Sequence, residues 1–401
     1  MLTIPIPDGA SRVQPKVVSW FYAAFLLAPD GSLWGWGDNS HSRLLAPKAP
    51  NERWPRPRRL GTNSDWIDLA VMHNAVVLLR REWTLWSWDA SGTNGSPDAP
   101  RLLSTNAGWR SIQNGISHVL ALQEDGSLWA WGQNNCGQVG DGTTNNHTAP
   151  VPIGTNRNWR VLAPGAFHSL AVQSNGTLWY WGRIDSHQPV TITPTNTLEP
   201  VQFGVETNWL AVVSGDYHTL AQKTDGSLWL MGPNTPSMTG QNNNPSNAMV
   251  RFEAMGGIRQ LAAGGMHCLA LRDDGSVWGF GRDYNGSLAR SSANGEPAHI
   301  GTRRDWAGVW SGSASFALAA DGTLWAWGTK LGEPNRLGFF ERIHHGIGQL
   351  AGMFGKGGGG GRAFGGVPPH TAVPWPIAKF VTNGVATAAE NNKLERTKLE
   401  N

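Results

Sequence analysis

An eight-residue phrase returns seven times along this chain of 401 residues. The clearest copies read DGSLWGWG from Asp30, DGSLWAWG from Asp125 and DGTLWAWG from Asp321, and four looser copies lie between them. The first tryptophans of successive copies stand 43 to 52 residues apart. A period near fifty residues indicates one supersecondary unit that is copied around or along an axis.

Each copy predicts four short strands. Asp-Gly favours a tight hairpin turn, with an apolar run before it and Leu-Trp-x-Trp-Gly after it. Alternation along that second run places both Trp side chains on one face of the sheet and Leu on the other. Another strand begins with an aromatic residue, as at Trp66 and Trp159, and a further strand follows a proline, as at Pro150 and Pro200. Four short strands without helical periodicity predict one blade of an all-β, seven-bladed β-propeller.

The first tryptophan of each copy occupies the same place in every predicted blade. A large aromatic ring buries much apolar surface, so we expect these side chains to pack between neighbouring blades. They are the structural tryptophans Trp34, Trp86, Trp129, Trp179, Trp229, Trp278 and Trp325.

The repeat also sets the expected domain boundaries. Residues 16–352 are predicted to form the propeller, after an N-terminal extension at 1–15 and before a Gly- and Pro-rich tail at 353–401 that we expect to be flexible and mostly disordered. Residues 346–352 resemble the start of the sixth copy. They are either the remnant of an eighth copy or a strand that helps to close the ring.

The third copy carries a resemblance to a known family. It contains Gly115-Ile-Ser-His118, then Asp125-Gly126, and then Asn134-Asn-Cys-Gly137-Gln-Val-Gly140. This order resembles the regulator of chromosome condensation repeat over residues 16–345, and the resemblance implies a seven-bladed propeller. Two departures stand out: the Asn-containing element is intact only in the third copy, and copies one, two and seven have Ala or Ser where the others have His.

The resemblance implies several possible activities. Its members include an exchange factor for a small nuclear GTPase, a plant ultraviolet photoreceptor and bacterial inhibitors of β-lactamase. The exchange factor uses an inserted β-wedge, and no insertion of that length separates the copies here. The photoreceptor repeats Gly-Trp-Arg-His-Thr, whereas the same places here read Gly-Ile-Ser-His, Gly-Ala-Phe-His, Gly-Asp-Tyr-His and Gly-Gly-Met-His. Light sensing is therefore not expected.

No catalytic, metal-binding or cofactor-binding motif is recognisable, so we expect a protein that is not an enzyme. One histidine recurs per blade in four copies, at His118, His168, His218 and His267. Because such residues repeat around a ring instead of converging, we predict a structural hydrogen-bonding role for them.

Charge and hydropathy give no sign of nucleic-acid or membrane binding. The net charge is +3, and the basic run Arg53–Arg59 is predicted to be a solvated loop. No run approaches the ~20 apolar residues that a membrane span needs. With no signal peptide visible at residue 1, the cytoplasm is the expected location, or the exterior if the N-terminus is a processed one.

The positions at which the copies differ point to a candidate binding surface. The residues between Gly and His are not fixed by the repeat, and many of them are aromatic. Aromatic and Met side chains are enriched in protein interfaces, so one face of the ring is predicted to bind another protein as a scaffold or inhibitor-like module. The alternative is partial burial of these side chains under neighbouring loops, and the alternative function is nucleotide exchange on a small GTPase. The candidate residues are Trp20, Phe21, Tyr22, Ser117, Phe167, Asp216, Tyr217 and Met266.

Overall fold

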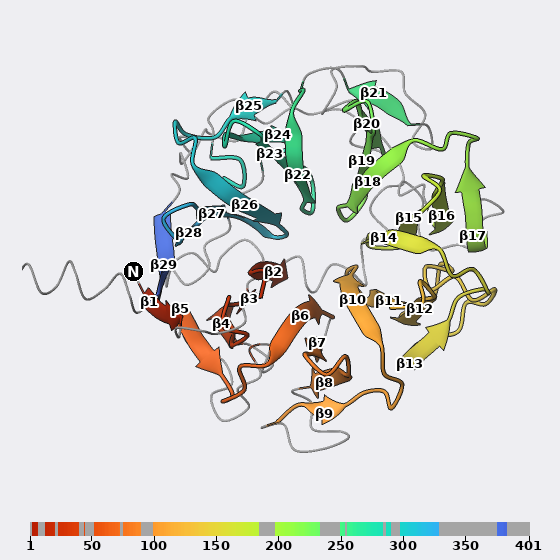
Figure 1. Cartoon of the computed structure of the whole chain (residues 1–401), viewed down its shortest axis with the longest axis horizontal. Helices are drawn as coiled ribbons and strands as arrows, with labels where there is room; N and C mark the ends of the chain where they lie inside the picture. Colours follow the sequence, from red (N-terminus) through yellow and green to blue (C-terminus); the bar gives the residue numbers. More distant parts are fainter. Residues whose placement is uncertain are drawn as a thin grey trace, which may run out of the picture.

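A computed structural model describes residues 2–6, 13–20, 23–39, 44, 52–72, 75–89, 99–183, 197–232, 249–252, 255–283, 286–289, 297–328 and 375–382. The described chain forms seven sheets, six antiparallel and one mixed, arranged as a ring around a central opening (Figure 1). This confirms the predicted all-β, seven-bladed propeller. No helix in the described part of the chain has the length and hydropathy to cross a membrane.

Each of the first six blades contains four strands in sequence order, from the innermost to the outermost. Blades one and two are β2 (Lys16–Trp20), β3 (Ala23–Leu27), β4 (Leu33–Asp38), β5 (Arg53–Leu60), β6 (Trp66–Val71), β7 (Ala75–Arg80), β8 (Leu85–Asp89) and β9 (Arg101–Leu102). Blades three and four are β10 (Trp109–Asn114), β11 (His118–Gln123), β12 (Leu128–Gly132), β13 (His147–Pro152), β14 (Trp159–Pro164), β15 (His168–Gln173), β16 (Leu178–Gly182) and β17 (Thr197–Phe203). Blades five and six are β18 (Trp209–Ser214), β19 (Thr219–Lys223), β20 (Leu228–Met231), β21 (Val250–Phe252), β22 (Ile258–Ala263), β23 (His267–Arg272), β24 (Val277–Gly281) and β25 (Ala298–His299).

Blade seven joins the two ends of the chain. It contains β26 (Trp306–Ser311), β27 (Ala314–Ala319) and β28 (Thr323–Gly328), and its outer strands are β29 (Trp375–Thr382) and β1 (Leu2–Ile6). The strand β29 runs antiparallel to β28, and β1 runs parallel to β29. Both ends of the chain thus form the outer edge of the same blade.

The predicted domain boundaries therefore leave out two strands of the ring, one in the assigned N-terminal extension and one in the assigned tail. Ile4 and Ala378 are buried in the core that joins blades seven and one, so this apolar surface draws both segments onto the propeller. Residues 346–352, which were predicted as a possible closing strand, lie outside the described residues. Apart from β29, the tail at 353–401 also lies outside them.

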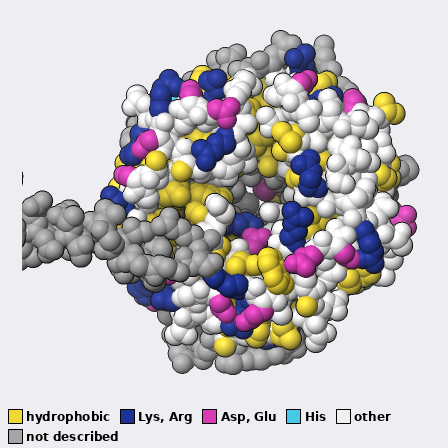
Figure 2. Space-filling model, viewed as in Figure 1, with side chains coloured by type: hydrophobic (Ala, Val, Ile, Leu, Met, Phe, Trp, Pro, Cys, Tyr) yellow, Lys and Arg dark blue, Asp and Glu magenta, His cyan; other side chains and the backbone are white. Residues whose placement is uncertain are grey.

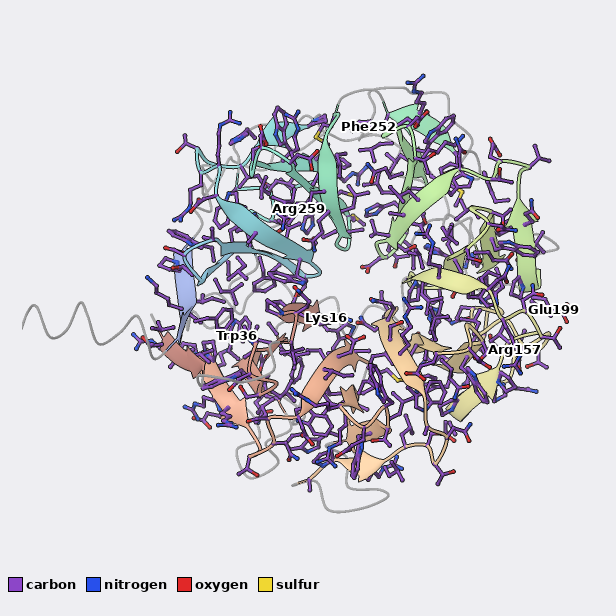
Figure 3. All side chains as sticks on the ribbon, viewed as in Figure 1. Lys16, Trp36, Arg157, Glu199, Phe252 and Arg259 are labelled. Carbon is purple, nitrogen blue, oxygen red and sulfur yellow. The ribbon has the colours of Figure 1, made fainter. Side chains whose placement is uncertain are left out.

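The core is divided into seven clusters, and each one spans a boundary between two blades. In the Leu-Trp-x-Trp motif, Leu128 packs toward blade four, whereas Trp129 and Trp131 pack toward blade two. The predicted separation of Leu and Trp on opposite sheet faces is therefore what the structure shows. Two aromatic side chains that pack between blades are labelled in Figure 3. Trp36 lies between blades one and seven, and Phe252 lies between blades five and six.

Within each motif, the residue two positions after the first Trp is more deeply buried than that Trp. Trp36, Trp131, Trp181 and Trp327 are at most 2% exposed. The seven tryptophans named from the sequence are partly exposed, and their rings cover the hairpin end of each blade boundary. Five of them make edge contacts with the Trp that begins the innermost strand of their own blade, as Trp129 does with Trp109 at 5.4 Å between ring centroids.

The hairpin turn explains why Ser or Thr follows Gly in the motif. In blade one, the Ser32 hydroxyl donates to the Asp30 carboxylate at 2.6 Å and accepts from the Trp34 indole N–H at 2.7 Å. The same Trp-to-hydroxyl bond recurs in blades two to six. The turn thus fixes the orientation of the tryptophan ring.

The basic run Arg53–Arg59 is part of the outer strand β5, which corrects its assignment as a loop. The side chains of Arg56, Arg58 and Arg59 are exposed on this strand, and Arg58 pairs with Glu52 at 3.0 Å. Its prolines are tolerated because β5 is the outermost strand of its blade.

Candidate functional site

We use the term inner loop for the short connection between the innermost strand of a blade and its second strand. The inner loops of blades three to six comprise residues 115–117, 165–167, 215–218 and 264–266, and the corresponding loop in blade seven comprises 312–313. They lie at the end of the blades opposite to the Asp-Gly hairpins, because neighbouring strands are antiparallel. Five of the predicted partner-binding residues lie on these loops: Ser117, Phe167, Asp216, Tyr217 and Met266.

The inner loops are joined to one another by backbone hydrogen bonds. The Ile116 N–H donates to the Gly165 carbonyl, the Ala166 N–H donates to the Asp216 carbonyl, and a third bond joins Gly265 to Gly312. Glycine is required where two loops approach: a Cβ on Gly115 would lie 2.2 Å from the Gly165 oxygen. This end of the ring is therefore a preorganised backbone surface.

A central channel of about 310 Å³ runs between the innermost strands and ends at the inner loops. Figure 2 shows the central hollow, with charged side chains of both signs around it. Lys16 points toward this opening (Figure 3). Its ammonium group donates to the Asp68 carboxylate at 2.8 Å and to the Ile112 carbonyl at 3.1 Å. Asp68 in turn accepts from the Ile112 N–H, so these charges connect blades one, two and three.

The structure brings together part of the predicted surface. Phe167 and Tyr217 extend from neighbouring blades, with ring centroids 6.4 Å apart and planes inclined by 34°. Both side chains are partly exposed, as are Asp216 and Met266.

Other candidates are not available for contact. Trp20 is 8% exposed and packs in the core between blades one and two, and Ser117 is 6% exposed. The alternative of burial thus describes these two residues, because they lie beneath the ring face. Phe21 and Tyr22 lie outside the described residues.

Asp216 carries the perturbed carboxyl group of this site. Although Asp216 is partly exposed at the channel, the surrounding protein displaces enough water from its carboxyl group to raise its pKa to about 6. Burial also raises the pKa of Tyr217, and the charge of Asp216 adds to this effect while Arg183 opposes it. Within the described residues, no hydrogen bond or ion pair reaches the Asp216 carboxylate, in contrast to Asp68.

Replacing Asp216 with Asn should stabilise the fold above pH 6. The carboxyl pKa is raised in the folded state, so ionisation above pH 6 disfavours folding relative to the unfolded chain, whose Asp titrates near 3.8. The full pKa shift of Asp216 corresponds to about 3 kcal/mol of unfolding free energy. We expect the Asn variant to be more stable by about 1–3 kcal/mol at pH 8, and this difference to vanish near pH 4. Urea unfolding of both proteins at the two pH values measures it. Equal stability at pH 8 would contradict the assignment.

The four histidines predicted from the sequence hydrogen-bond across blade boundaries. His118 Nε2 lies 2.8 Å from Ser169 Oγ, and His267 Nε2 lies 2.8 Å from Ser315 Oγ. His168 contacts Thr219 at 3.3 Å, and His218 contacts the Cys268 sulfur at 3.1 Å. Since Ser169 donates its own proton to the Gln138 carbonyl, it accepts from His118 Nε2–H. The geometry therefore places a proton on Nε2 of His118.

These contacts follow a pattern in the sequence of neighbouring copies. The partner always directly follows the equivalent His position of the next blade: Ser169, Thr219, Cys268 and Ser315. Where the preceding blade has Ala in place of His, the partner position is apolar. Ala23 in blade one precedes Val76 in blade two, and Ala75 in blade two precedes Val119 in blade three. This pairing between copies could have been found by aligning each blade with its neighbour.

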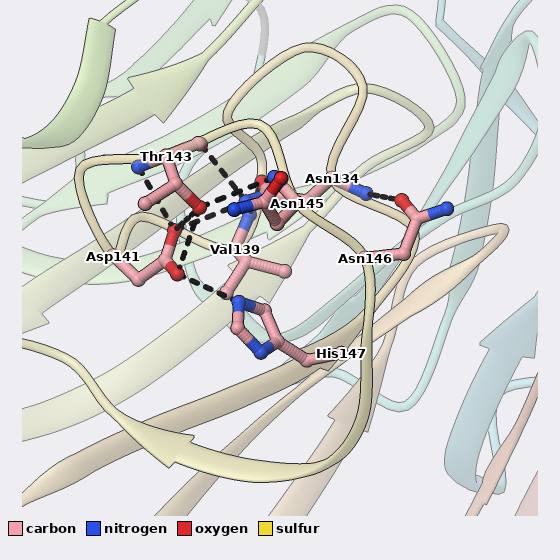
Figure 4. Close-up of polar contacts among 7 residues, drawn as sticks. All are labelled: Asn134, Val139, Asp141, Thr143, Asn145, Asn146 and His147. Atoms are coloured by element: carbon pink, nitrogen blue, oxygen red, sulfur yellow. Dashed lines mark hydrogen bonds and ion pairs between the residues drawn. The ribbon is translucent and has the colours of Figure 1, made fainter.

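The connection between β12 and β13 is held by a polar network around Asn134 (Figure 4). Asn134 Oδ1 accepts from the Val139 N–H, and its amide donates to Asp141 and to the Thr143 carbonyl. Asp141 also contacts His147 Nε2 at 2.7 Å. The Gln138 carbonyl of this loop accepts from Trp181 and Ser169, which fastens the loop to blade four.

The Asn element has structural equivalents that sequence comparison missed. In blade one, Asn39 Oδ1 accepts from the Leu44 N–H, and in blade six Asp283 Oδ1 accepts from the Leu288 N–H. The three loops share one feature: a side-chain oxygen accepts from the N–H of a buried aliphatic residue five positions later. The surrounding Gly and Gln residues, which define the motif by eye, are not needed for this contact.

Substituting Asn134 with Ala should destabilise the propeller by roughly 2–3 kcal/mol, because several buried polar groups lose their partners at once. Asn134 is fully buried. Asn145 is a matched control in the same loop, since its side chain is exposed. Chemical denaturation of both Ala variants is the measurement, and equal losses would contradict a specific role for Asn134.

Among the described residues, no group of three or more His, Cys, Asp or Glu side chains is arranged to hold a metal ion. The described histidines of the repeat are engaged between blades, so the channel and the inner loops are the remaining candidate site.

Comparison with protein families agrees with the resemblance seen in the sequence. A model of the regulator of chromosome condensation (RCC1) repeat matches residues 125–172, and a second RCC1-repeat model matches 110–138 and 258–287. These matches cover blade three, the first half of blade four and most of blade six. Together with the seven-bladed fold, they confirm RCC1-type repeats in this chain. Comparison with curated proteins found no match.

Solved structures share the fold at low sequence identity. Human WBSCR16 aligns with a TM-score of 0.65 and 16% identity, over 75% of this chain and 85% of WBSCR16. Yeast RCC1 (Prp20), solved bound to Kap60, aligns with a TM-score of 0.63 and 20% identity over 80% of each chain. A structure of Prp20p from Saccharomyces cerevisiae, described with its binding properties to Gsp1p and histones, aligns with a TM-score of 0.59 and 20% identity, over 78% of this chain and 82% of Prp20p.

Proposed function

We propose that this propeller of RCC1-type repeats is a non-enzymatic binding protein that contacts another protein through its inner-loop face. The observation that carries this proposal is the aromatic pair Phe167 and Tyr217. These rings come from the inner loops of different blades, meet at 6.4 Å and remain partly exposed. Rigid, partly exposed aromatic side chains are the usual energetic anchors of protein interfaces.

The backbone around this pair supports the proposal. The Phe167 carbonyl accepts from the Arg183 N–H, and the loop that carries Tyr217 is tied to Ala166 in blade four. A partner would therefore meet a surface that is already ordered, which lowers the entropic cost of binding. The residues between Gly and His differ from blade to blade, so the face has no sevenfold symmetry and presents a particular pattern to a partner.

The double substitution Phe167→Ala and Tyr217→Ala should abolish capture of the partner from a lysate of the source cells. We expect at least a tenfold loss of retained protein, because interface anchors contribute about 2 kcal/mol or more each. Trp83→Ala is the matched control: Trp83 is 41% exposed at the hairpin end of blade two, on the opposite face. Retention by the double variant equal to that of the control would remove the inner-loop face from consideration.

Nucleotide exchange on a small GTPase is the second candidate function. The observation that favours it is the shared fold with Prp20p, whose binding properties to Gsp1p have been described. This is an argument from the fold and not from the site. The test is release of a fluorescent guanine nucleotide from purified small GTPases, where acceleration of tenfold or more would support exchange. Release at the intrinsic rate for every GTPase tested would reject it.

A further inference from the structure

Asp216 is held in a fixed place at the inner-loop end of the channel. Its carbonyl accepts from the Ala166 N–H at 3.1 Å, and its side chain lines the channel. The carboxylate lies over Gly265 of the next blade, where a Cβ would come within 3.1 Å of Asp216 Oδ2. Blade six thus leaves space for this carboxylate.

The described residues supply no counter-charge to Asp216. Lys16, the ammonium group of the same channel, is engaged by Asp68 and by the Ile112 carbonyl. Arg183 is 7% exposed and has interactions of its own on the side of Tyr217. The histidines of blades four, five and six are neutral, because burial lowers their pKa values to about 4, 3 and 4. A desolvated carboxylate without a partner is costly, and such groups cluster at functional sites.

The surroundings of Asp216 favour a positive group. The hydroxyl-bearing residues Ser214, Ser311 and Ser313 line the same channel. Tyr217 directly follows Asp216 in the chain and its ring contacts that of Phe167, and the faces of aromatic rings attract cations. At about 310 Å³ the channel is at the small end of ligand-binding cavities, which suits one extended side chain or a small amine.

We infer that the inner-loop end of the channel binds an ammonium or guanidinium group, with Asp216 as its counter-charge. Such a group occurs in free alkyl amines and in the Lys and Arg side chains of a protein. The inference does not depend on the proposed protein-binding function, since a free amine would satisfy the same site.

The experiment measures binding of defined cations to the full chain at pH 8 by calorimetry. The probes are n-butylguanidinium, n-butylammonium and the capped peptide Gly-Gly-Arg-Gly-Gly, with acetate as a negative control. We expect saturable binding of at least one cationic probe and a weakening of tenfold or more in Asp216→Asn. Asp273→Asn is the matched control, because Asp273 is an exposed carboxylate at the hairpin end of blade six. It should bind as the parent protein does.

A second readout separates pairing with Asp216 from a general structural effect. Carboxyl-carbon NMR follows the titration of Asp216, and a saturating cation should lower its pKa by one unit or more. Binding of the small cations alone indicates a free amine as the natural ligand, whereas binding of the peptide indicates a basic side chain. Absence of saturable binding, equal affinity in Asp216→Asn, or an unchanged pKa of Asp216 would overturn the inference.

Discussion

Lowering the pH from 6.5 to 4.5 is expected to unfold this propeller, well before its surface carboxylates are protonated. The cause is the set of four histidines buried between blades. Burial lowers the pKa of His118 and His218 to about 3, and that of His168 and His267 to about 4. Neighbouring histidines lower those of His118 and His218 further. The folded protein therefore keeps all four neutral throughout this range.

The direction of the effect follows from proton linkage. In the unfolded chain these histidines titrate near 6.5, so below that pH the unfolded state binds protons that the folded state does not. Stability is complete above pH 6.5 and falls toward the folded pKa values. As the pH falls, each histidine lowers the free energy of unfolding by about 1.4 kcal/mol per pH unit, and the four together lower it by roughly 5 kcal/mol per unit. That loss is comparable with the total stability of a typical domain, about 5–15 kcal/mol.

Asp216 acts in the opposite direction and on a smaller scale. Because its folded pKa is raised to about 6, the folded state gains stability as the pH falls from 6 toward 3.8. One carboxyl group offsets about one of the four histidines. The hairpin carboxylates Asp225, Asp274 and Asp321 have lowered pKa values, so their protonation begins only below this window.

Urea unfolding followed by tryptophan fluorescence between pH 7 and 4.5 measures this loss. The matched variant is His218→Ala combined with Cys268→Val, which copies the Ala and Val pairing found at two other blade boundaries. Removing one of the four histidines should reduce the slope of unfolding free energy against pH by about a quarter. An identical slope in the double variant would show that the buried histidines do not govern acid unfolding.

Trp181→Ala should cost about 3–5 kcal/mol of stability, the usual range for removal of a fully buried large aromatic side chain. Trp181 is 0% exposed in the core between blades three and four. Its indole N–H donates to the Gln138 carbonyl at 2.9 Å, and its ring lies 6.3 Å from that of Trp159. The substitution thus leaves a cavity and also releases the loop that blade three extends over blade four.

Trp179→Ala is the control, because Trp179 comes from the same motif and contacts the same Trp159 ring. Trp179 is partly exposed and its indole N–H donates to Thr177, so we expect a smaller loss of roughly 1–3 kcal/mol. Both variants are compared by the midpoint and slope of denaturant unfolding. A loss for Trp179→Ala equal to or larger than that for Trp181→Ala would contradict the assignment of the second Trp as the main anchor.

Much of this architecture could be predicted because the same local sequence pattern occurs in seven copies. The Asp-Gly turn, the alternation of Leu and Trp and the proline before the outer strand depend on neighbours within one blade. Closure of the ring could not be predicted in this way. The strand β29 follows a long Gly- and Pro-rich segment, and β1 contains a proline, Pro5, so neither resembles the repeat. Their place depends on the apolar edge of blade seven, which only the assembled ring presents.

The candidate site could also be predicted only in part from the sequence. The positions between Gly and His were found as the places where the copies differ, and Phe167 and Tyr217 do meet there. Exposure could not be inferred, because it depends on the neighbouring blade: Trp20 occupies a Gly position and turns into the core between blades one and two.

The sequence by itself determined the strand pattern, the number of blades and the side of each sheet that carries the tryptophans, because these follow from short-range turn chemistry and alternation. Only the tertiary structure decided how the chain ends close the ring, that Trp20 turns into the core, and that Asp216 faces the channel without a counter-charge. Those features arise between residues about fifty or more positions apart, where the separation and relative tilt of packed blades set each contact.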